Sequence, residues 1–142
     1  MIYRKMPENF NPIFEAVGCF IEHSNNILLL MRRDEKPEGN TWALPSGKKD
    51  LKENAEYAML REIKEETGYI IPKNQLVYVD EYYVRYSLYD FAYHIFNTRV
   101  GKNDIQLNKA EHKGYLWITP KEALILPLIE DLDSCINLFY NI

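Results

Sequence analysis

Three glutamates in the segment 62–66 have the type and spacing needed to bind a divalent cation. In a helix, Glu62, Glu65 and Glu66 stand at positions i, i+3 and i+4, so their carboxylates share one arc of roughly 100°. Like charges at this spacing cost a few tenths of a kcal/mol, and partial burial penalises each ionised carboxylate further. A hard cation such as Mg²⁺ or Mn²⁺ would reverse this balance, because it takes oxygen ligands and commonly combines carboxylates with substrate phosphates.

The same glutamates could instead form a solvated acidic face, with Glu62 paired at the surface to Arg61 or Lys64. The residues before the helix favour the metal interpretation. Gly47 lets a backbone carbonyl turn toward an ion, or lets a phosphate approach closely. Lys48 could then hold a phosphate oxygen as a point charge.

Glu53 and Arg61 add an orienting pair, because a contact between them would tie the loop to the helix. Together these residues resemble the signature of the Nudix hydrolase family, here called the signature segment (residues 47–69, 23 of 142). Two positions depart from it: Tyr69 replaces an aliphatic residue, and Ser46 stands where many members have a second glycine. The matching residues are Gly47, Glu53, Arg61, Glu62, Glu65, Glu66 and Gly68.

The resemblance implies metal-dependent hydrolysis of a nucleoside diphosphate that is linked to another group, with Mg²⁺ or Mn²⁺ as the cofactor. It also implies that Glu62 is either a metal ligand or the general base. Glu111 resembles a glutamate that lies further along the chain in family members and acts as a further ligand or general base. The resemblance further implies that a backbone carbonyl of the Gly47 region, that of Ser46 or of Gly47, completes the coordination. The expected metal ligands are therefore Gly47, Glu62, Glu65, Glu66 and Glu111, and the expected catalytic residues are Glu53, Arg61, Glu62, Glu66 and Glu111.

Four residues are candidates for binding the substrate. Lys48 could contact phosphate, and so could one of Arg32 and Arg33, of which Arg33 is the named candidate; Trp42 and Tyr86 could stack on a base. Core packing is the alternative for the two aromatic residues, and a solvated strand end is the alternative for Arg33.

The expected reaction is that of a MutT-type nucleoside triphosphate pyrophosphatase, which releases pyrophosphate and a monophosphate. Hydrolysis of a dinucleoside polyphosphate or a nucleotide sugar is an alternative of the same class. Tyr86, at 17 residues after Tyr69, matches a tyrosine typical of the dinucleoside polyphosphate group. A module that binds a nucleotide without cleaving it is an alternative of another class, although such modules usually lose the glutamates that remain here.

Length and composition predict one domain spanning residues 1–142. Hydrophobic residues make up 46% of the chain and charged residues 27%, the usual globular mixture. The formal charge of −4 argues against bulk-charge binding to a nucleic-acid polymer and leaves a small nucleotide as the expected partner. No apolar run is long enough to span a membrane, and the first residues lack a signal-peptide core, so a cytoplasmic location is expected.

Smaller features complete these expectations. Cys19 and Cys135 are expected to be reduced, buried thiols, and the histidines at positions 23, 94 and 112 lack zinc-like spacing. The apolar residues 138–142 could support a homodimer or simply close the core.

The elements that position this chemistry follow from hydrophobic periodicity. A helix is predicted over residues 54–67, with Asn54 as its N-cap and Gly68 as a left-handed C-cap. The segments between the elements include predicted loops at 33–41 and 46–53. The fold class is α/β (α+β), with a mixed sheet covered by helices, and the resemblance implies an α-β-α sandwich. Strands are predicted at 16–22, 27–32, 76–86, 91–100 and 115–118, and further helices at Thr119–Pro120 onward and at 129–140.

Overall fold

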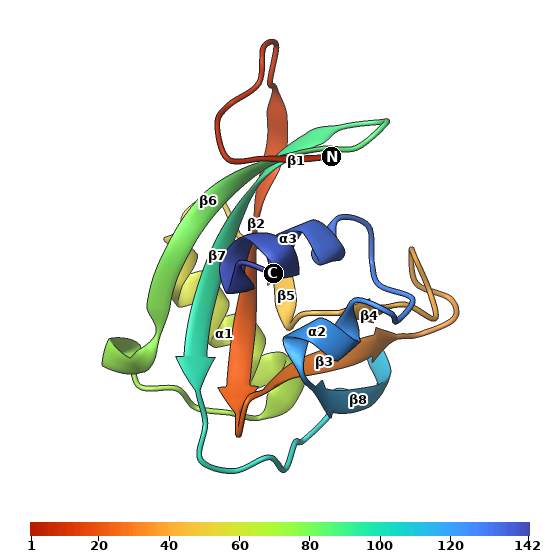
Figure 1. Cartoon of the computed structure of the whole chain (residues 1–142). Helices are drawn as coiled ribbons and strands as arrows, with labels where there is room; N and C mark the ends of the chain where they lie inside the picture. The colour runs from red at the N-terminus through yellow and green to blue at the C-terminus, as the bar shows by residue number, and fades with distance from the viewer.

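The computed structural model describes residues 1–142 and shows a mixed eight-stranded sheet with helices on both faces (Figure 1). In this view α1 lies behind the sheet, and α2 and α3 lie in front of it. The predicted α+β fold with a central mixed sheet is confirmed. The strands are β1 (Ile2–Tyr3), β2 (Pro12–His23), β3 (Asn26–Arg32), β4 (Trp42–Ala43), β5 (Ser46–Lys48), β6 (Val77–Arg85), β7 (Asp90–Arg99) and β8 (His112–Ile118); the helices are α1 (Ala55–Thr67), the 3-10 turn η1 (Lys73–Gln75), α2 (Pro120–Ala123) and α3 (Leu132–Tyr140).

The sheet is built around β2, in the strand order β1-β6-β7-β2-β3-β4. β2 runs parallel to β7, and every other strand pairing is antiparallel. β5 pairs with β2, and β8 pairs with β3, outside this main order. The parallel pairing joins segments far apart in the sequence, so it could not be predicted from neighbouring turns.

β2 and β3 form a hairpin only at the turn that joins them, where two residue pairs are in register. Beyond the turn the strands diverge (Figure 1), and the chain after β4 enters between them. The backbone N–H of Cys19 donates to the Pro45 carbonyl at 3.0 Å, and β5 then pairs with residues 16–18. The prediction of a loop over 46–53 was therefore wrong for its first three residues, which β2 recruits into the sheet.

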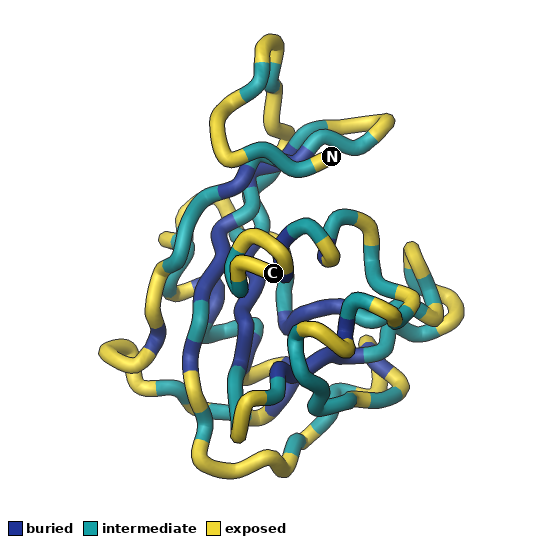
Figure 2. Tube along the Cα trace, in the orientation of Figure 1, coloured by how far each residue is buried: buried dark blue, intermediate teal, exposed yellow.

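Each face of the sheet packs a separate hydrophobic core. On the face covered by α1 (the α1 face), Val17 and Cys19 pack with Met59 and Ile63. On the opposite face (the α3 face), Phe20 belongs to the core under α2 and α3. Strands covered on both faces are apolar almost without interruption, and Figure 2 shows this burial along the central strands. Both cysteines are buried free thiols, as predicted.

The sequence predicted both ends of α1 correctly but placed the start of α3 too early. The Asn54 side chain accepts a hydrogen bond from the Tyr57 N–H at 2.8 Å, and Gly68 is left-handed with φ 82°. The closing helix begins at Leu132 rather than at residue 129, because the Ile129 N–H binds the carbonyl of Trp42 in β4. None of the helices combines the length and apolar character needed to cross a membrane.

The aromatic residues at the end of α3 close the core on that face. The Phe139 ring stacks on Phe20 at a centroid distance of 4.9 Å. The Tyr140 hydroxyl donates to Glu22 at 2.8 Å, while Leu138 stays partly exposed. Core closure therefore accounts for the aromatic part of the apolar C-terminal segment.

The end of α1 should not tolerate a side chain at residue 68. An alanine Cβ at Gly68 would lie 2.9 Å from the Cβ of Gln106, in a left-handed conformation that L residues disfavour. We expect Gly68→Ala to lower the free energy of unfolding by about 1–2 kcal/mol in urea denaturation. Gly101→Ala is the control, because a Cβ there meets no atom within 4 Å. Equal stabilities of the two variants would contradict this account.

Candidate functional site

The glutamates of α1 face β5, which lies where β2 and β3 diverge. Glu66 is only 5% exposed, and its Oε1 accepts a hydrogen bond from the Ser46 N–H at 3.1 Å. The Glu62 side chain is 13% exposed, whereas that of Glu65 is 55% exposed. The carboxylates therefore range from buried to solvent-accessible along one side of α1, which is not the uniformly solvated face of the alternative interpretation.

Gly47 makes room for Glu62. A Cβ added at Gly47 would lie 2.2 Å from the carboxyl carbon of Glu62 and 2.3 Å from its Oε1. Gly47 does not have a positive φ, since Gly68 is the one glycine that does. The glycine is therefore required for space, and not for the backbone freedom that the sequence suggested.

Arg61 fixes the orientation of two carboxylates. Its Nε and Nη2 donate to the two oxygens of Glu53, each at 2.8 Å, which confirms the predicted pairing. Its Nη1 donates to Glu62 Oε1 at 2.8 Å, and Nη2 also reaches the Lys48 carbonyl at 3.3 Å. The Arg61 contact lowers the pKa of Glu53 to about 2, so Glu53 stays ionised. The loop after β5 is thereby tied to the face of α1 that carries the glutamates.

The electrostatics of this group suit a divalent cation. Burial raises the pKa of Glu66 well above its ordinary value, opposed by the Ser46 N–H and reinforced by the charge of Glu62. Burial also raises the pKa of Glu62, although Arg61 opposes the shift. The donors are hard oxygens, and a cation among them would offset the cost of ionising desolvated carboxylates. The residues present therefore fit the ion that the resemblance implies.

Glu111 reaches the same group from a distant part of the sequence. It lies directly before β8, and its carboxylate is close enough to contribute to the raised pKa of Glu66. Its side chain is 51% exposed and lies 3.5 Å from Lys36 Nζ. The structure thus brings a fourth carboxylate toward the α1 glutamates.

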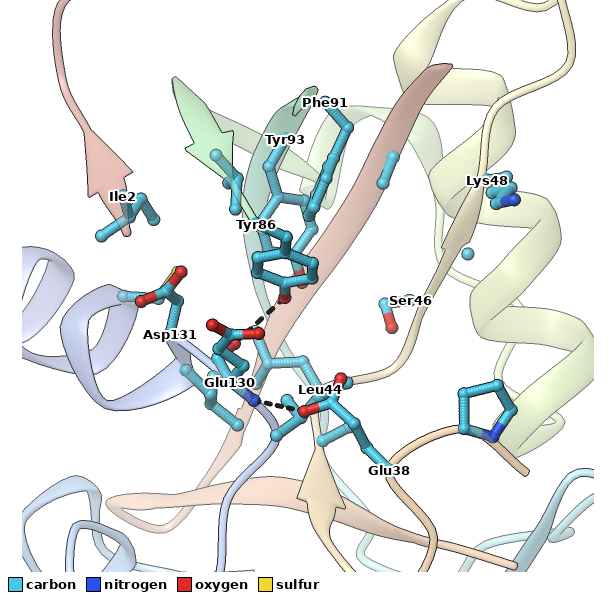
Figure 3. A pocket seen from close by; sticks show the side chains of 18 of the residues that line it. Ile2, Glu38, Leu44, Ser46, Lys48, Tyr86, Phe91, Tyr93, Glu130 and Asp131 are labelled. Carbon is cyan, nitrogen blue, oxygen red and sulfur yellow. Dashed lines mark hydrogen bonds between the residues drawn. The ribbon is translucent and has the colours of Figure 1, made fainter. Parts of the chain in front are cut away.

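A cavity of about 320 Å³ opens beside β5 on the α3 face of the sheet (the β5 cavity, Figure 3). Lys48 and Tyr86, two of the predicted substrate contacts, line it. Lys48 Nζ lies 4.4 Å from the ring centre of Phe14, within cation–π range. The cavity has an aromatic wall and an acidic end; the wall is formed by Phe14, Tyr86, Tyr89, Phe91 and Tyr93, and the acidic end by Glu38, Glu130 and Asp131.

Two predicted substrate contacts do not line this cavity. Arg33 pairs with Glu35 at 2.5 Å and donates to the Lys109 carbonyl at 3.0 Å. Trp42 packs against the core of the α3 face. Arg32 lines the cavity instead, with its Nε bound to the Pro37 carbonyl. Arg32 is the last residue of β3 and Arg33 follows it, and the sequence did not decide which of these neighbours would contact a ligand.

Other cavity residues were missed because the first long strand begins earlier than predicted. β2 starts at Pro12 rather than at Ala16, and its extension carries Phe14. Phe14 and Ala16 both line the cavity, as period-2 alternation requires once the strand includes residue 14. The position of Tyr93 depends on the parallel pairing of β7 with β2, for which no local signal exists.

A second group of possible metal ligands lies on the α1 face, outside the signature segment. Glu15, Glu81 and His94 place ligand atoms within 4.8 Å of one another. His94 Nε2 lies 2.7 Å from Glu15, and its Nδ1 lies 2.8 Å from the Tyr78 hydroxyl. Lys49 Nζ lies 3.3 Å from the other oxygen of Glu15. These partners already satisfy the group, which we interpret as a polar network joining β2, β6 and β7 to the loop before α1, with Lys49–Glu15 as its ion pair.

Comparisons with known proteins identify one family and similar folds. The family model described as NUDIX domain matches residues 12–139. The chain is 28% identical over 116 residues to a protein named CTP pyrophosphohydrolase from Escherichia coli (strain K12), covering 82% of this chain and 83% of that protein. The solution structure of the E. coli ORF135 protein has a TM-score of 0.75 at 25% identity, covering 90% and 89% of the two chains. The MutT protein of Methanosarcina mazei Go1 has a TM-score of 0.77 at 23% identity, covering 92% and 94%.

Glu66 should destabilise the metal-free protein at neutral pH. Its pKa is higher in the folded than in the unfolded chain, so the folded state binds more protons above pH 4.5 and loses stability as the pH rises through the folded pKa. Glu66→Gln removes this cost and keeps an oxygen for the Ser46 N–H. In a metal chelator at pH 8 we expect the Tm of the variant to rise by about 3–4 °C, or about 1 kcal/mol.

At pH 4, where the wild-type carboxyl is also protonated, the two melting temperatures should nearly coincide. An unchanged or lower Tm of Glu66→Gln at pH 8 would show that the folded protein carries this carboxylate without penalty.

Proposed function

The chain belongs to the Nudix family, and on that premise we propose that it is a divalent-metal-dependent hydrolase of nucleoside triphosphates, yielding the monophosphate and pyrophosphate. The observation that carries this proposal is the position of β5, which has the α1 glutamates on one side and an aromatic cavity beside it. The cavity volume of about 320 Å³ lies in the range of small-molecule sites. The similarity to a protein named CTP pyrophosphohydrolase also favours a triphosphate substrate.

We assign the metal ion, Mg²⁺ or Mn²⁺, to the carboxylates that gather at α1. Glu65 and Glu66 are ligands, Glu62 and Glu111 serve as ligands or as the proton acceptor, and the carbonyl of Ser46 or Gly47 completes the set. When bound, the ion supplies charge neutralisation at the diphosphate and makes the attacking water more acidic.

The remaining steps fall to side chains of the chain itself. A carboxylate of the group accepts the proton of the attacking water, for which a pKa raised by burial is favourable. Arg61 positions Glu62 through its 2.8 Å contact, and Glu53 in turn holds Arg61. Lys48 holds a phosphate oxygen where the cavity adjoins β5. The rate gain comes mainly from positioning and charge stabilisation, as in phosphoryl transfer generally.

The aromatic wall provides the binding surface for the nucleoside. Tyr86 lines this wall, and its hydroxyl donates to the Glu130 carbonyl at 3.3 Å, which fixes the ring at the acidic end. Flat apolar faces with a few polar groups at the edge suit a stacked base. Tyr86 is thus the base-stacking residue of the proposal.

A substrate panel with Mg²⁺ tests the proposed reaction. It includes ordinary and oxidised nucleoside triphosphates, dinucleoside polyphosphates, ADP-ribose and nucleotide sugars, with the products identified. We expect triphosphates to yield monophosphate and pyrophosphate, and Glu66→Gln to fold normally but lose at least about 10²-fold in turnover. Turnover of dinucleoside polyphosphates or nucleotide sugars alone would establish the same-class alternative. Binding of nucleotide without hydrolysis of any compound would establish a non-catalytic module.

Gly47→Ala tests whether the Glu62 carboxylate must occupy the space beside β5. The new Cβ would displace that carboxylate, so we expect kcat to fall by about 10–100-fold and the apparent affinity for Mn²⁺ to weaken in titrations. Gly114→Ala is the matched control, because a Cβ there meets nothing within 4 Å. Wild-type turnover by a folded Gly47→Ala protein would remove Glu62 from the proposed machinery.

A further inference from the structure

Tyr93 brings a phenol hydroxyl to the β5 cavity without giving it a partner in the chain. Tyr93 lines the cavity from β7. The Tyr86 hydroxyl donates to the Glu130 carbonyl at 3.3 Å, whereas no side-chain hydrogen bond involves Tyr93. Tyr93 is half-buried, and its hydroxyl is not among the buried polar atoms that lack a partner. It is therefore open to the cavity and free to form a hydrogen bond with a molecule bound there.

Gly18 reveals where this hydroxyl lies. A Cβ at Gly18 would be 2.2 Å from Tyr93 Oη and 2.8 Å from its Cζ, so the end of the phenol rests directly on the backbone of β2. Gly18 is paired in register with Ser46 of β5. The ring of Tyr93 thus reaches from β7 onto β2, and Figure 3 shows Tyr93 and Ser46 on either side of that strand.

This position lies between the two ends of the cavity. Ser46 and Lys48 belong to β5, beside the carboxylates that we assign to the metal and phosphates. Glu130 and Asp131 form part of the opposite, acidic end. In Figure 3 Tyr93 lies between these two pairs. In any nucleotide the sugar joins the phosphates to the base, so a nucleotide spanning the cavity would bring its sugar to Tyr93.

Building on the proposed function, we propose that the Tyr93 hydroxyl donates a hydrogen bond to a hydroxyl group of the nucleotide sugar and thereby determines specificity at that position. The substrate class this implies is a nucleotide that carries the matching sugar hydroxyl, with rejection of the analogue that lacks it. Gly18 serves this function indirectly, because the absence of a side chain there allows the hydroxyl end of the phenol to lie against β2.

The chemistry of the phenol suits a donor. Burial raises the pKa of Tyr93 well above its ordinary value, so the hydroxyl keeps its proton throughout the neutral range. When the sugar lacks its hydroxyl, the bound nucleotide leaves the phenol without an acceptor. Sites built to hydrogen-bond a substrate hydroxyl discriminate strongly for this reason.

A cycle of protein and ligand changes tests the proposal. kcat/KM is measured for a ribonucleoside triphosphate and for its 2′-deoxy and 3′-deoxy analogues, with wild-type protein and with Tyr93→Phe. We expect the wild type to lose about 10-fold or more on one of the analogues, chiefly through KM. Tyr93→Phe should lose a similar factor on the intact nucleotide and show no further loss on that analogue. Tyr115→Phe, on an exposed tyrosine of β8, is the control and should keep the wild-type discrimination.

A structural role for the hydroxyl would lower kcat/KM equally for all three nucleotides, and that result, or no effect of Tyr93→Phe, would overturn the proposal. Gly18→Ala provides a second variant, because its Cβ must displace the phenol and should abolish the discrimination in a folded protein. The same comparison made by calorimetric binding of the three nucleoside monophosphates requires no turnover. It therefore tests the sugar contact even if hydrolysis of triphosphates, and with it the proposed function, fails.

Discussion

The desolvation of the carboxylates on α1 is the constraint on which the rest of the site depends. Glu66 is almost fully buried and the Glu62 side chain is 13% exposed, and the charge of Glu62 raises the cost of ionising Glu66. The Ser46 N–H opposes this cost at Glu66, and the Arg61 guanidinium opposes it at Glu62. A folded protein keeps such an arrangement only where the surrounding packing enforces it, and a dication removes the penalty. The carboxylates that destabilise the metal-free protein are thus also the groups that we assign to the cation.

The divided sheet makes this arrangement possible. β5 enters where β2 and β3 separate, and it borders both the carboxylate group and the cavity. Its Ser46 N–H holds Glu66 on the α1 face, and the side of β5 that faces α3 lines the cavity with Lys48. A single three-residue strand therefore links the group suited to a cation with the surface suited to an organic ligand. Because β5 is held by hydrogen bonds to β2, this relationship is fixed by a central strand of the sheet.

Two glycines show how the fold places polar groups that come from other elements. A side chain at Gly47 would occupy the position of the Glu62 carboxylate, and a side chain at Gly18 would occupy that of the Tyr93 hydroxyl. Neither glycine needs a positive φ. Each instead lets a functional group from α1 or β7 lie against the backbone of the central strands. The close approach that these contacts provide is a second use of glycine, separate from its conformational freedom.

The sequence alone determined α1, the arc of its three glutamates and the pairing of Glu53 with Arg61, because all of these depend on helical spacing and on caps within a few residues. It also indicated the family, since the signature segment is continuous. Only the tertiary structure decided that Arg32 rather than Arg33 lines the cavity, and that Tyr93 meets Gly18. These contacts depend on where β2 begins, on its parallel pairing with β7 and on the divergence of β3. Such long-range registers arise from packing both faces of the sheet at once, and no local pattern encodes them.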